Sequence, residues 1–360
     1  MSDQLASTSP APMRPGIEIV PPTSFLEVRD LCVHFPTEDG VVRSVDGLSY
    51  RLELGRTLGI VGESGSGKSV SSLSVMGLHK AGSARMSGQI WLDGEDLLAA
   101  SPEHVRQLRG KKMAMIFQDP LSAMHPYFTV GAQIIEAYRI HNDVSKKVAR
   151  KHAIDMLGRV GIPQPTSRVD DYPHQFSGGM RQRAMIAMAL SCDPQLLIAD
   201  EPTTALDVTV QAQILDLIRD LQADFNSAVI IITHDLGVVA ELSDDILVMY
   251  AGKAVEYASA EEIFSSPEHP YTWGLLGSMP RMDRVRSERL LPIKGIPPSL
   301  INVPPGCAFH PRCAFEGRNG GLSQTAVPAI LESSPGHFVA CHLPSDARHE
   351  IWATEIAPKL

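Results

Sequence analysis

The sequence predicts an α/β protein built around a parallel sheet, and three observations support this fold. Short apolar runs at residues 57–61, 195–198 and 228–232 are bounded by polar residues, as in strands that are buried on both faces. An amphipathic helical pattern at 210–221 separates the last two runs and gives a strand–helix–strand order. A glycine-rich loop follows the first run and precedes a helical pattern at 70–78.

Composition indicates a globular protein that does not bind nucleic acid. The chain has 360 residues, of which 44% are hydrophobic and 20% are charged, and its net charge is −9. A nucleic-acid-binding protein usually has a basic face, which this balance does not favour. No apolar run approaches the roughly 18 residues that cross a bilayer, and the N-terminal stretch has no apolar signal-peptide core. We therefore expect a cytoplasmic protein whose membrane role, if it has one, comes through a partner.

Proline content and hydrophobic periodicity divide the chain into three parts. Residues 1–24 are rich in proline and predict a disordered leader. Residues 25–259 predict one nucleotide-binding unit without an internal repeat. Its strands are expected at 25–35, 41–54, 57–61 and 89–92, and a helical insertion at about 119–190. Residues 260–360 contain frequent prolines and little periodicity, which predicts a smaller, irregular C-terminal domain.

The loop at residues 62–69 carries the clearest chemistry. It matches G-x-x-x-x-G-K-[ST] at every fixed position, and its residues are Gly62, Glu63, Ser64, Gly65, Ser66, Gly67, Lys68 and Ser69. Glycines let backbone N–H groups turn toward phosphate oxygens, and the following helix adds its positive N-terminal end. Lys68 is expected to neutralise the β- and γ-phosphates, and Ser69 to bind Mg²⁺. The alternative is a glycine-rich turn with a chance lysine.

A second element is the apolar run that ends in Asp200 and Glu201. A buried strand that delivers an acidic residue at its C-terminal end is typical of a magnesium-binding Walker B element. Asp200 is expected to hold Mg²⁺, and Glu201 to orient and polarise the attacking water. The alternative is an ordinary acidic turn after a buried strand.

Three weaker features narrow the class. Ser177, Gly178 and Gly179 precede a helical run and predict a second anion site, which suggests a site shared between two subunits. Gln118 follows the apolar stretch 115–117 and can sense Mg²⁺ or water. His234 follows the apolar run at 228–232 and can donate a hydrogen bond to the γ-phosphate. Each feature alone is more often structural, but together they occur in a consistent order.

With these motifs the chain resembles an ABC transporter nucleotide-binding subunit from about residue 25 to 259. The resemblance implies a P-loop NTPase cassette with an antiparallel β subdomain and a helical subdomain, plus the small C-terminal domain. It implies ATP and Mg²⁺ as ligands, with ATP held between the phosphate loop of one cassette and the signature segment, residues 177–182, of another. Phe176 stands where leucine is commoner in this family. Further nucleotide contacts are implied at Phe35, which would stack on adenine (Tyr50 is the weaker choice), and at Val70, Gln182 and Asp207 of the D-loop 205–207.

The C-terminal part resembles the peptide and nickel importer branch of the same family, through the stretches 265–280, 295–298 and 306–313. That branch usually carries four cysteines that can hold a [4Fe-4S] cluster. Here Cys307, Cys313 and Cys341 match, and Gly320 stands at the fourth position. A mixed site for zinc or a cluster with His310, His337 or His342, and a metal-free domain, are the alternatives that remain open.

The resemblance implies an ATPase that powers import of oligopeptides or dipeptides, with nickel or another small solute as the close alternative. It implies a second, non-identical ATPase subunit, two membrane permease subunits and an extracytoplasmic substrate-binding protein. The chain would lie at the cytoplasmic face of the membrane, held there by the permeases. A soluble, non-transport ABC ATPase acting on DNA or ribosomes is less favoured, because such proteins usually carry long coiled-coil insertions or two cassettes.

Overall fold

The computed structural model describes residues 23–204, 206–279 and 293–360, so most of the expected leader and position 205 of the expected D-loop lie outside it. The strands are β1 (Leu26–Thr37), β2 (Gly40–Leu52), β3 (Thr57–Val61), β4 (Arg85–Leu92), β5 (Glu95–Asp96), β6 (Met113–Ile116), β7 (Leu196–Asp200), β8 (Ala228–Thr233), β9 (Asp245–Tyr250), β10 (Lys253–Ser259), β11 (Leu331–Ser334) and β12 (His337–Val339). The helices are α1 (Lys68–Val75), α2 (Pro102–Leu108), α3 (Pro120–Ala123), α4 (Val130–His141), α5 (Lys146–Arg159), α6 (Pro165–Arg168), α7 (Gly178–Ala189), α8 (Val208–Phe225), α9 (Leu236–Leu242), α10 (Ala260–Ser265), α11 (Pro270–Gly277), α12 (Leu322–Thr325) and α13 (Ser345–Ile351).

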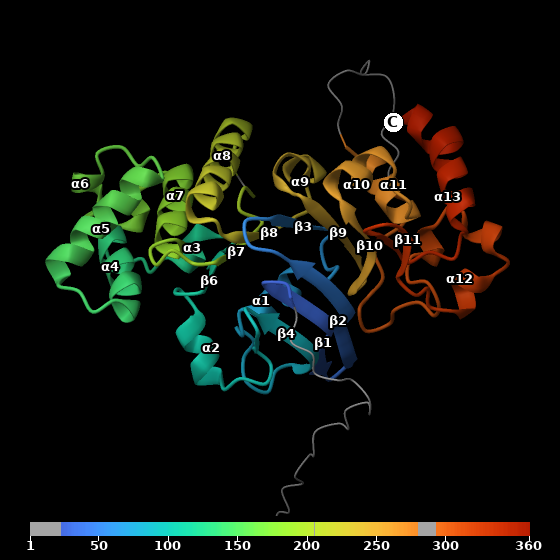
Figure 1. Cartoon of the computed structure of the whole chain (residues 1–360), viewed down its shortest axis with the longest axis horizontal. Helices are drawn as coiled ribbons and strands as arrows, with labels where there is room; N and C mark the ends of the chain where they lie inside the picture. The colour runs from blue at the N-terminus through green and yellow to red at the C-terminus, as the bar shows by residue number, and fades with distance from the viewer. Residues whose placement is uncertain (1–22, 205, 280–292) are drawn as a thin grey trace, which may run out of the picture.

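Two sheets organise the fold (Figure 1). The larger has the strand order β11-β12-β10-β9-β3-β8-β7-β6, and its pairs from β9 to β6 are parallel. The smaller, β2-β1-β4-β5, is antiparallel throughout. The predicted α/β class with an antiparallel subdomain is therefore confirmed. Parallel strands end at one edge of the sheet, so β3, β6, β7 and β8 deliver the loops that follow them to the same place.

Burial explains the central strands, and helix capping explains the bounds of helix α8. All residues of β3, β7 and β8 are buried, as their unbroken apolar runs predict. The helix expected at 210–221 extends over Val208–Phe225, because Asp207 caps its first turn and Asn226 ends it in the left-handed conformation. The expected helical insertion corresponds to α3 to α7. These helices lie at one end of the molecule in Figure 1, with the smaller sheet below its middle.

The C-terminal region is joined to the larger sheet. Strand β12 pairs antiparallel with β10, and β11 pairs with β12, so the sheet continues past the parallel strands into this region. Helix α13 lies beyond them at the opposite end of the molecule from α5 and α6 (Figure 1). In the described parts of the chain, no helix is both long enough and apolar enough to cross a membrane.

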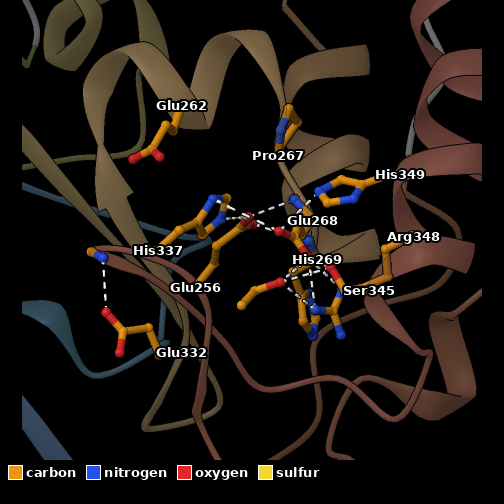
Figure 2. Close-up of polar contacts among 12 residues, drawn as sticks. Glu256, Glu262, Pro267, Glu268, His269, Glu332, His337, Ser345, Arg348 and His349 are labelled. Carbon is orange, nitrogen blue, oxygen red and sulfur yellow. Dashed lines mark hydrogen bonds and ion pairs between the residues drawn. The ribbon is translucent and has the colours of Figure 1, made fainter.

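A buried polar network fastens this region to the cassette (Figure 2). The Glu256 carboxylate on β10 is fully buried and accepts hydrogen bonds from the backbone N–H groups of Glu268 and His269, at 2.6 and 3.1 Å. His337 of β12 lies 2.8 Å from the same carboxylate. Glu268 in turn pairs with Arg348 of α13 at 2.6 Å. Buried charges persist only when they are paired and hydrogen-bonded, and this network meets that condition across three elements.

The network makes a pH-dependent contribution to stability through His337. Burial alone would lower the pKa of this imidazole, but the hydrogen bond and charge of Glu256, with Glu268 and Glu262 nearby, raise it above the ordinary 6.5. A raised histidine pKa stabilises the fold fully below about pH 6.5, and the stabilisation is lost as the pH rises through the folded-state pKa.

Replacing His337 by Gln should therefore destabilise the protein by about 3 kcal/mol at pH 6 and by less at alkaline pH. Thermal unfolding of both proteins across this range measures the difference. His342→Gln is the matched control, because that ring bonds the backbone carbonyl of Ala326 at 2.7 Å. A destabilisation by His337→Gln that is the same at every pH would contradict the assignment.

Candidate functional site

The phosphate loop connects β3 to α1, as the sequence predicts. Gly62 has φ +154 and a Cβ there would lie 2.2 Å from the carbonyl oxygen of Met249. Gly67 has φ +100 and a Cβ there would lie 2.1 Å from the carbonyl oxygen of Ser44. Only glycine fits these two positions, because each combines an unfavourable backbone angle with a backbone clash. Between them, Ser64 and Gly65 are exposed and available to a ligand.

Lys68 lies beneath this loop. Its side chain is buried, and its ammonium group donates to the carbonyl oxygens of Gly62 at 2.6 Å and Glu63 at 3.0 Å. Burial lowers the pKa of Lys68, and the carboxylates of Glu201 and Asp200 partly oppose that shift. The Lys68 ammonium group is stabilised here by two carbonyl oxygens, and a polyphosphate bound in the loop would supply a full negative charge instead.

A pair of oxygen ligands lies beside the loop. The hydroxyl of Ser69 donates to Asp200 Oδ1 at 3.0 Å, although the two residues are 131 positions apart. Asp200 ends β7, and burial raises its pKa while the Ser69 hydrogen bond lowers it. Hydroxyl and carboxylate oxygens are the ligands that Mg²⁺ prefers, and it usually keeps several waters. These two residues would fit a magnesium ion, which would supply positive charge beside the phosphate loop.

Glu201 is the centre of the remaining polar side chains. Its carboxylate accepts hydrogen bonds from Gln118 Nε2 at 2.8 Å and Thr204 Oγ1 at 2.9 Å, and lies 3.2 Å from His234 Nδ1. Its backbone has φ +47, which a non-glycine residue rarely adopts, and its N–H donates to the carbonyl of Ile232 at 2.8 Å. Strained backbone of this kind costs about 1–3 kcal/mol and clusters at functional sites. The structure thus brings Gln118, Glu201 and His234 together from the ends of three strands.

Thr204 is a contact that the sequence did not reveal. It lies in the turn after β7, where no spacing rule distinguishes it from the neighbouring Thr203, which is buried.

The segment Ser177–Gly179 begins α7 on the helical subdomain. Ser177 caps the helix by accepting from the Met180 N–H at 3.3 Å, and Ser177 and Gly178 are exposed. In the described part of the chain, neither residue has a hydrogen bond to the phosphate loop. Gln182 differs from its predicted role, because it is only 2% exposed and does not reach the surface that Ser177 and Gly178 form.

The other predicted nucleotide contacts lie as follows. Phe35 is half-buried and packs edge-on against His79, with ring centres 5.6 Å apart. Tyr50 is buried and therefore cannot stack on a base in this conformation. Val70 is half-buried in the first turn of α1, and Asp207 is exposed at the start of α8.

Two family models match this chain. The model described as "ABC transporter" matches residues 45–204, and the model described as "Oligopeptide/dipeptide transporter, C-terminal region" matches residues 255–319. The dipeptide transport ATP-binding protein DppD of Bacillus subtilis is 54% identical over 326 residues, which cover 90% of this chain and 96% of that protein. This chain belongs to the family of oligopeptide/dipeptide ABC transporter ATP-binding proteins. Another member, the oligopeptide transport ATP-binding protein OppD of Salmonella typhimurium, is 48% identical and covers 90% of this chain and 95% of that protein.

Solved structures of the wider ABC family confirm the fold. The match to MJ0796, a dimeric bacterial ABC transporter cassette, spans 65% of this chain and 98% of the MJ0796 chain, with a TM-score of 0.59 and 23% sequence identity. The match to cbiO1 from Clostridium perfringens spans 68% of this chain and 91% of the cbiO1 chain, with a TM-score of 0.57 and 26% sequence identity. The P-loop NTPase cassette is thereby confirmed, and membership of the ABC family implies ATP and Mg²⁺ as its ligands.

The three C-terminal cysteines of this family member, Cys307, Cys313 and Cys341, are half-buried free thiols. Burial raises the pKa of Cys307, of Cys313 to about 12 and of Cys341 to about 11, and the charge of neighbouring thiols adds to the shifts of Cys313 and Cys341. Gly320, at the fourth position, offers no ligand atom. The donor set therefore does not fit a [4Fe-4S] cluster held by four thiolates, and nothing in the comparisons supports such a cluster.

The zinc alternative is not supported either. His310 and His342 bond backbone carbonyls, and His337 bonds Glu256. Among the described residues, the group of three His, Cys or acidic side chains whose ligand atoms lie within 4.8 Å of one another is Cys32, His34 and Asp46, on β1 and β2. There, Lys253 already forms an ion pair with Asp46 at 2.9 Å.

Proposed function

We propose that this chain is the ATPase subunit that powers import of oligopeptides or dipeptides through a membrane ABC transporter. The observation that carries the proposal is the meeting of Lys68, the Ser69–Asp200 pair and Glu201 at one edge of the sheet. Support for the cargo comes from the C-terminal family match and from relatives named for oligopeptide and dipeptide transport.

The chemistry divides among these side chains. Lys68 and the loop N–H groups would bind the β- and γ-phosphates, and Ser69 with Asp200 would hold Mg²⁺, which would supply positive charge to neutralise the charge that develops. Glu201 accepts the hydrogen bond of the attacking water and aligns it with the γ-phosphorus. His234 and Gln118 contact the Glu201 carboxylate and hold that base in place; His234 would also donate to the γ-phosphate, and Gln118 would sense the metal or its water.

The site is completed by a second cassette. Ser177 and Gly178 are exposed at the N-terminus of α7, where free N–H groups attract an anion, and they lie outside this chain's own phosphate loop. They would close on ATP bound to a non-identical partner ATPase, while the partner's signature segment closes on this chain's ATP. ATP binding favours the closed pair, and phosphate release reopens it.

The turn between α3 and α4 is suited to contact the permeases. Tyr127 is 82% exposed and Phe128 is 54% exposed, which is unusual for aromatic side chains on a free surface. Buried Gln133 holds the turn by bonding the N–H and carbonyl groups of His125 and the carbonyl of Phe128. The turn lies ten residues or fewer after Gln118, so motion at the ATP site can reach it. This contact would place the chain at the cytoplasmic face of the membrane, beside two permeases and an extracytoplasmic binding protein.

Reconstitution with the permeases, partner ATPase and binding protein tests this function. Peptides should stimulate ATP turnover and enter the vesicles, whereas nickel should do neither. Replacing Tyr127 and Phe128 together by Ser should reduce stimulated turnover at least about tenfold, by loss of buried aromatic contacts, and leave ATP affinity unchanged. Val327→Ser, a similarly exposed apolar residue on the C-terminal region at 61%, is the control. Stimulation by nickel alone would refute the peptide assignment.

A further inference from the structure

An arginine of the C-terminal region contacts the phosphate loop directly. Arg312 Nη1 lies 2.5 Å from Glu63 Oε2, and its Nη2 lies 2.9 Å from Glu63 Oε1, although the two residues are 249 positions apart. The pair is therefore bidentate, the strongest geometry for arginine and carboxylate. The side chain of Arg312 is 5% exposed and that of Glu63 is 28% exposed, so solvent screens this pair far less than a surface ion pair.

Every N–H donor of Arg312 has an acceptor. Beyond the two bonds to Glu63, its Nε donates to the carbonyl of Lys294 at 2.9 Å, Nη2 to the carbonyl of Gly295 at 3.3 Å, and Nη1 to the hydroxyl of Tyr250 at 3.4 Å. A guanidinium has five N–H donors in a fixed fork, and all of them are used here. Arg312 is thus held rigidly, and it ties residues 294–295 to the loop.

The backbone of Glu63 is also held by hydrogen bonds. Its N–H donates to the hydroxyl of Tyr271 at 2.8 Å, and Tyr271 is fully buried in α11. Its carbonyl accepts a hydrogen bond from the Lys68 ammonium group at 3.0 Å. The side chain, N–H and carbonyl of this one loop residue are therefore all fixed. Two of these three contacts come from Tyr271 and Arg312, which follow β9, the last of the parallel strands.

Fixing this residue matters because the loop around it is costly to order. Gly62, Gly65 and Gly67 all have positive φ, and glycine loses more conformational freedom on ordering than other residues do. A loop that is already ordered before the ligand arrives does not lose that entropy on binding. If only a fraction of molecules has the loop in the binding conformation, the apparent dissociation constant rises by the inverse of that fraction.

We infer that Arg312 is a positioning residue for the ATP site, which holds the phosphate loop in its binding conformation through Glu63. The C-terminal region then sets nucleotide affinity and is part of the ATP-binding machinery. This rests on the proposed function, because it assumes that the loop binds ATP. All N–H groups of Arg312 bond protein atoms, so we expect its effect to be on binding and not on the chemical step.

Nucleotide affinity of the full-length chain tests this role. Arg312→Met and Glu63→Gln should each weaken Mg·ADP binding, measured by titration calorimetry, by about tenfold, the size expected for a hydrogen bond to a charged group. The double variant should bind no more weakly than either single one, because both changes break the same contact. Arg312→Lys should recover part of the affinity. In the assembled transporter the KM for ATP should rise while kcat stays within about twofold.

The matched control is Arg318→Met. Arg318 also forms a bidentate pair with a glutamate, Glu355, at 2.6 and 3.1 Å in the same region, but this pair is exposed and lies away from the loop. Its loss should leave Mg·ADP affinity unchanged.

Several results would overturn the inference. Additive losses in the double variant would do so, as would unchanged Mg·ADP affinity in a folded Arg312→Met protein of lower melting temperature. If Arg312→Met does not fold, Glu63→Gln decides alone, and unchanged affinity there overturns it. Wild-type protein that fails to bind Mg·ADP would instead refute the proposed function. Wild-type binding with unaffected variants refutes only the role of Arg312.

Discussion

Replacing Glu201 by Gln should lower ATP turnover by about a thousandfold while leaving ATP affinity within about twofold of wild type. The amide is nearly the same size and can keep the contacts with Gln118 and Thr204, but it cannot accept a proton from the attacking water. Positioned general bases contribute about 10² to 10⁴ in rate, so this is the range of the expected loss. Single-turnover hydrolysis of radiolabelled ATP separates this defect from slow product release.

The control for this substitution is another glutamate that is remote from the nucleotide. The Glu241 side chain on α9 is half-exposed, and its Oε1 lies 3.4 Å from Nη2 of Arg219, which is also half-exposed. Glu241→Gln should turn over ATP at the wild-type rate. Turnover by Glu201→Gln at the wild-type rate would show that another group polarises the water.

The sequence predicts that these side chains meet, because they lie at the ends of strands. Glu201 and His234 each follow an apolar run that is buried on both faces, and such runs belong to neighbouring parallel strands whose C-terminal ends meet. Lys68 and its glycines follow another run of the same kind. Once these runs are recognised as one sheet, the meeting of the side chains follows without knowledge of the turns between them.

Other contacts could not be predicted, for two physical reasons. Arg312 and Tyr271 reach Glu63 from segments 249 and 208 positions away, and no pattern in the sequence shows that these segments pack against the phosphate loop. Strands β11 and β12, of four and three residues, are too short to show alternation, and the buried contact of His337 with Glu256 that joins β12 to β10 has no sequence signal. Gln182 was misplaced for a simpler reason: five residues along a helix from Ser177 is about 140° around its axis, which points inward.

Replacing Gly178 by Asp should reduce ATP turnover about a hundredfold or more without weakening ATP binding by the chain's own loop. A Cβ at Gly178 would meet nothing within 4 Å, and an acidic residue in the first turn of α7 stabilises a helix. The fold should therefore be intact. A carboxylate that faces the γ-phosphate of a partner's ATP at ~4 Å would cost about 4 kcal/mol at an effective dielectric constant of ~20. Gly178→Asn, of equal size but uncharged, should lose much less activity.

The same variant decides which cassette completes the site. A Gly178→Asp chain keeps its phosphate loop, and a Lys68→Ala chain keeps its signature segment, so a pair of the two would contain one complete site. If two copies of this chain paired with each other, mixing the variants would restore turnover. We expect no restoration, because we propose that the partner is a different ATPase. Turnover restored by mixing, in the absence of any other ATPase subunit, would show that this chain forms its composite site with itself.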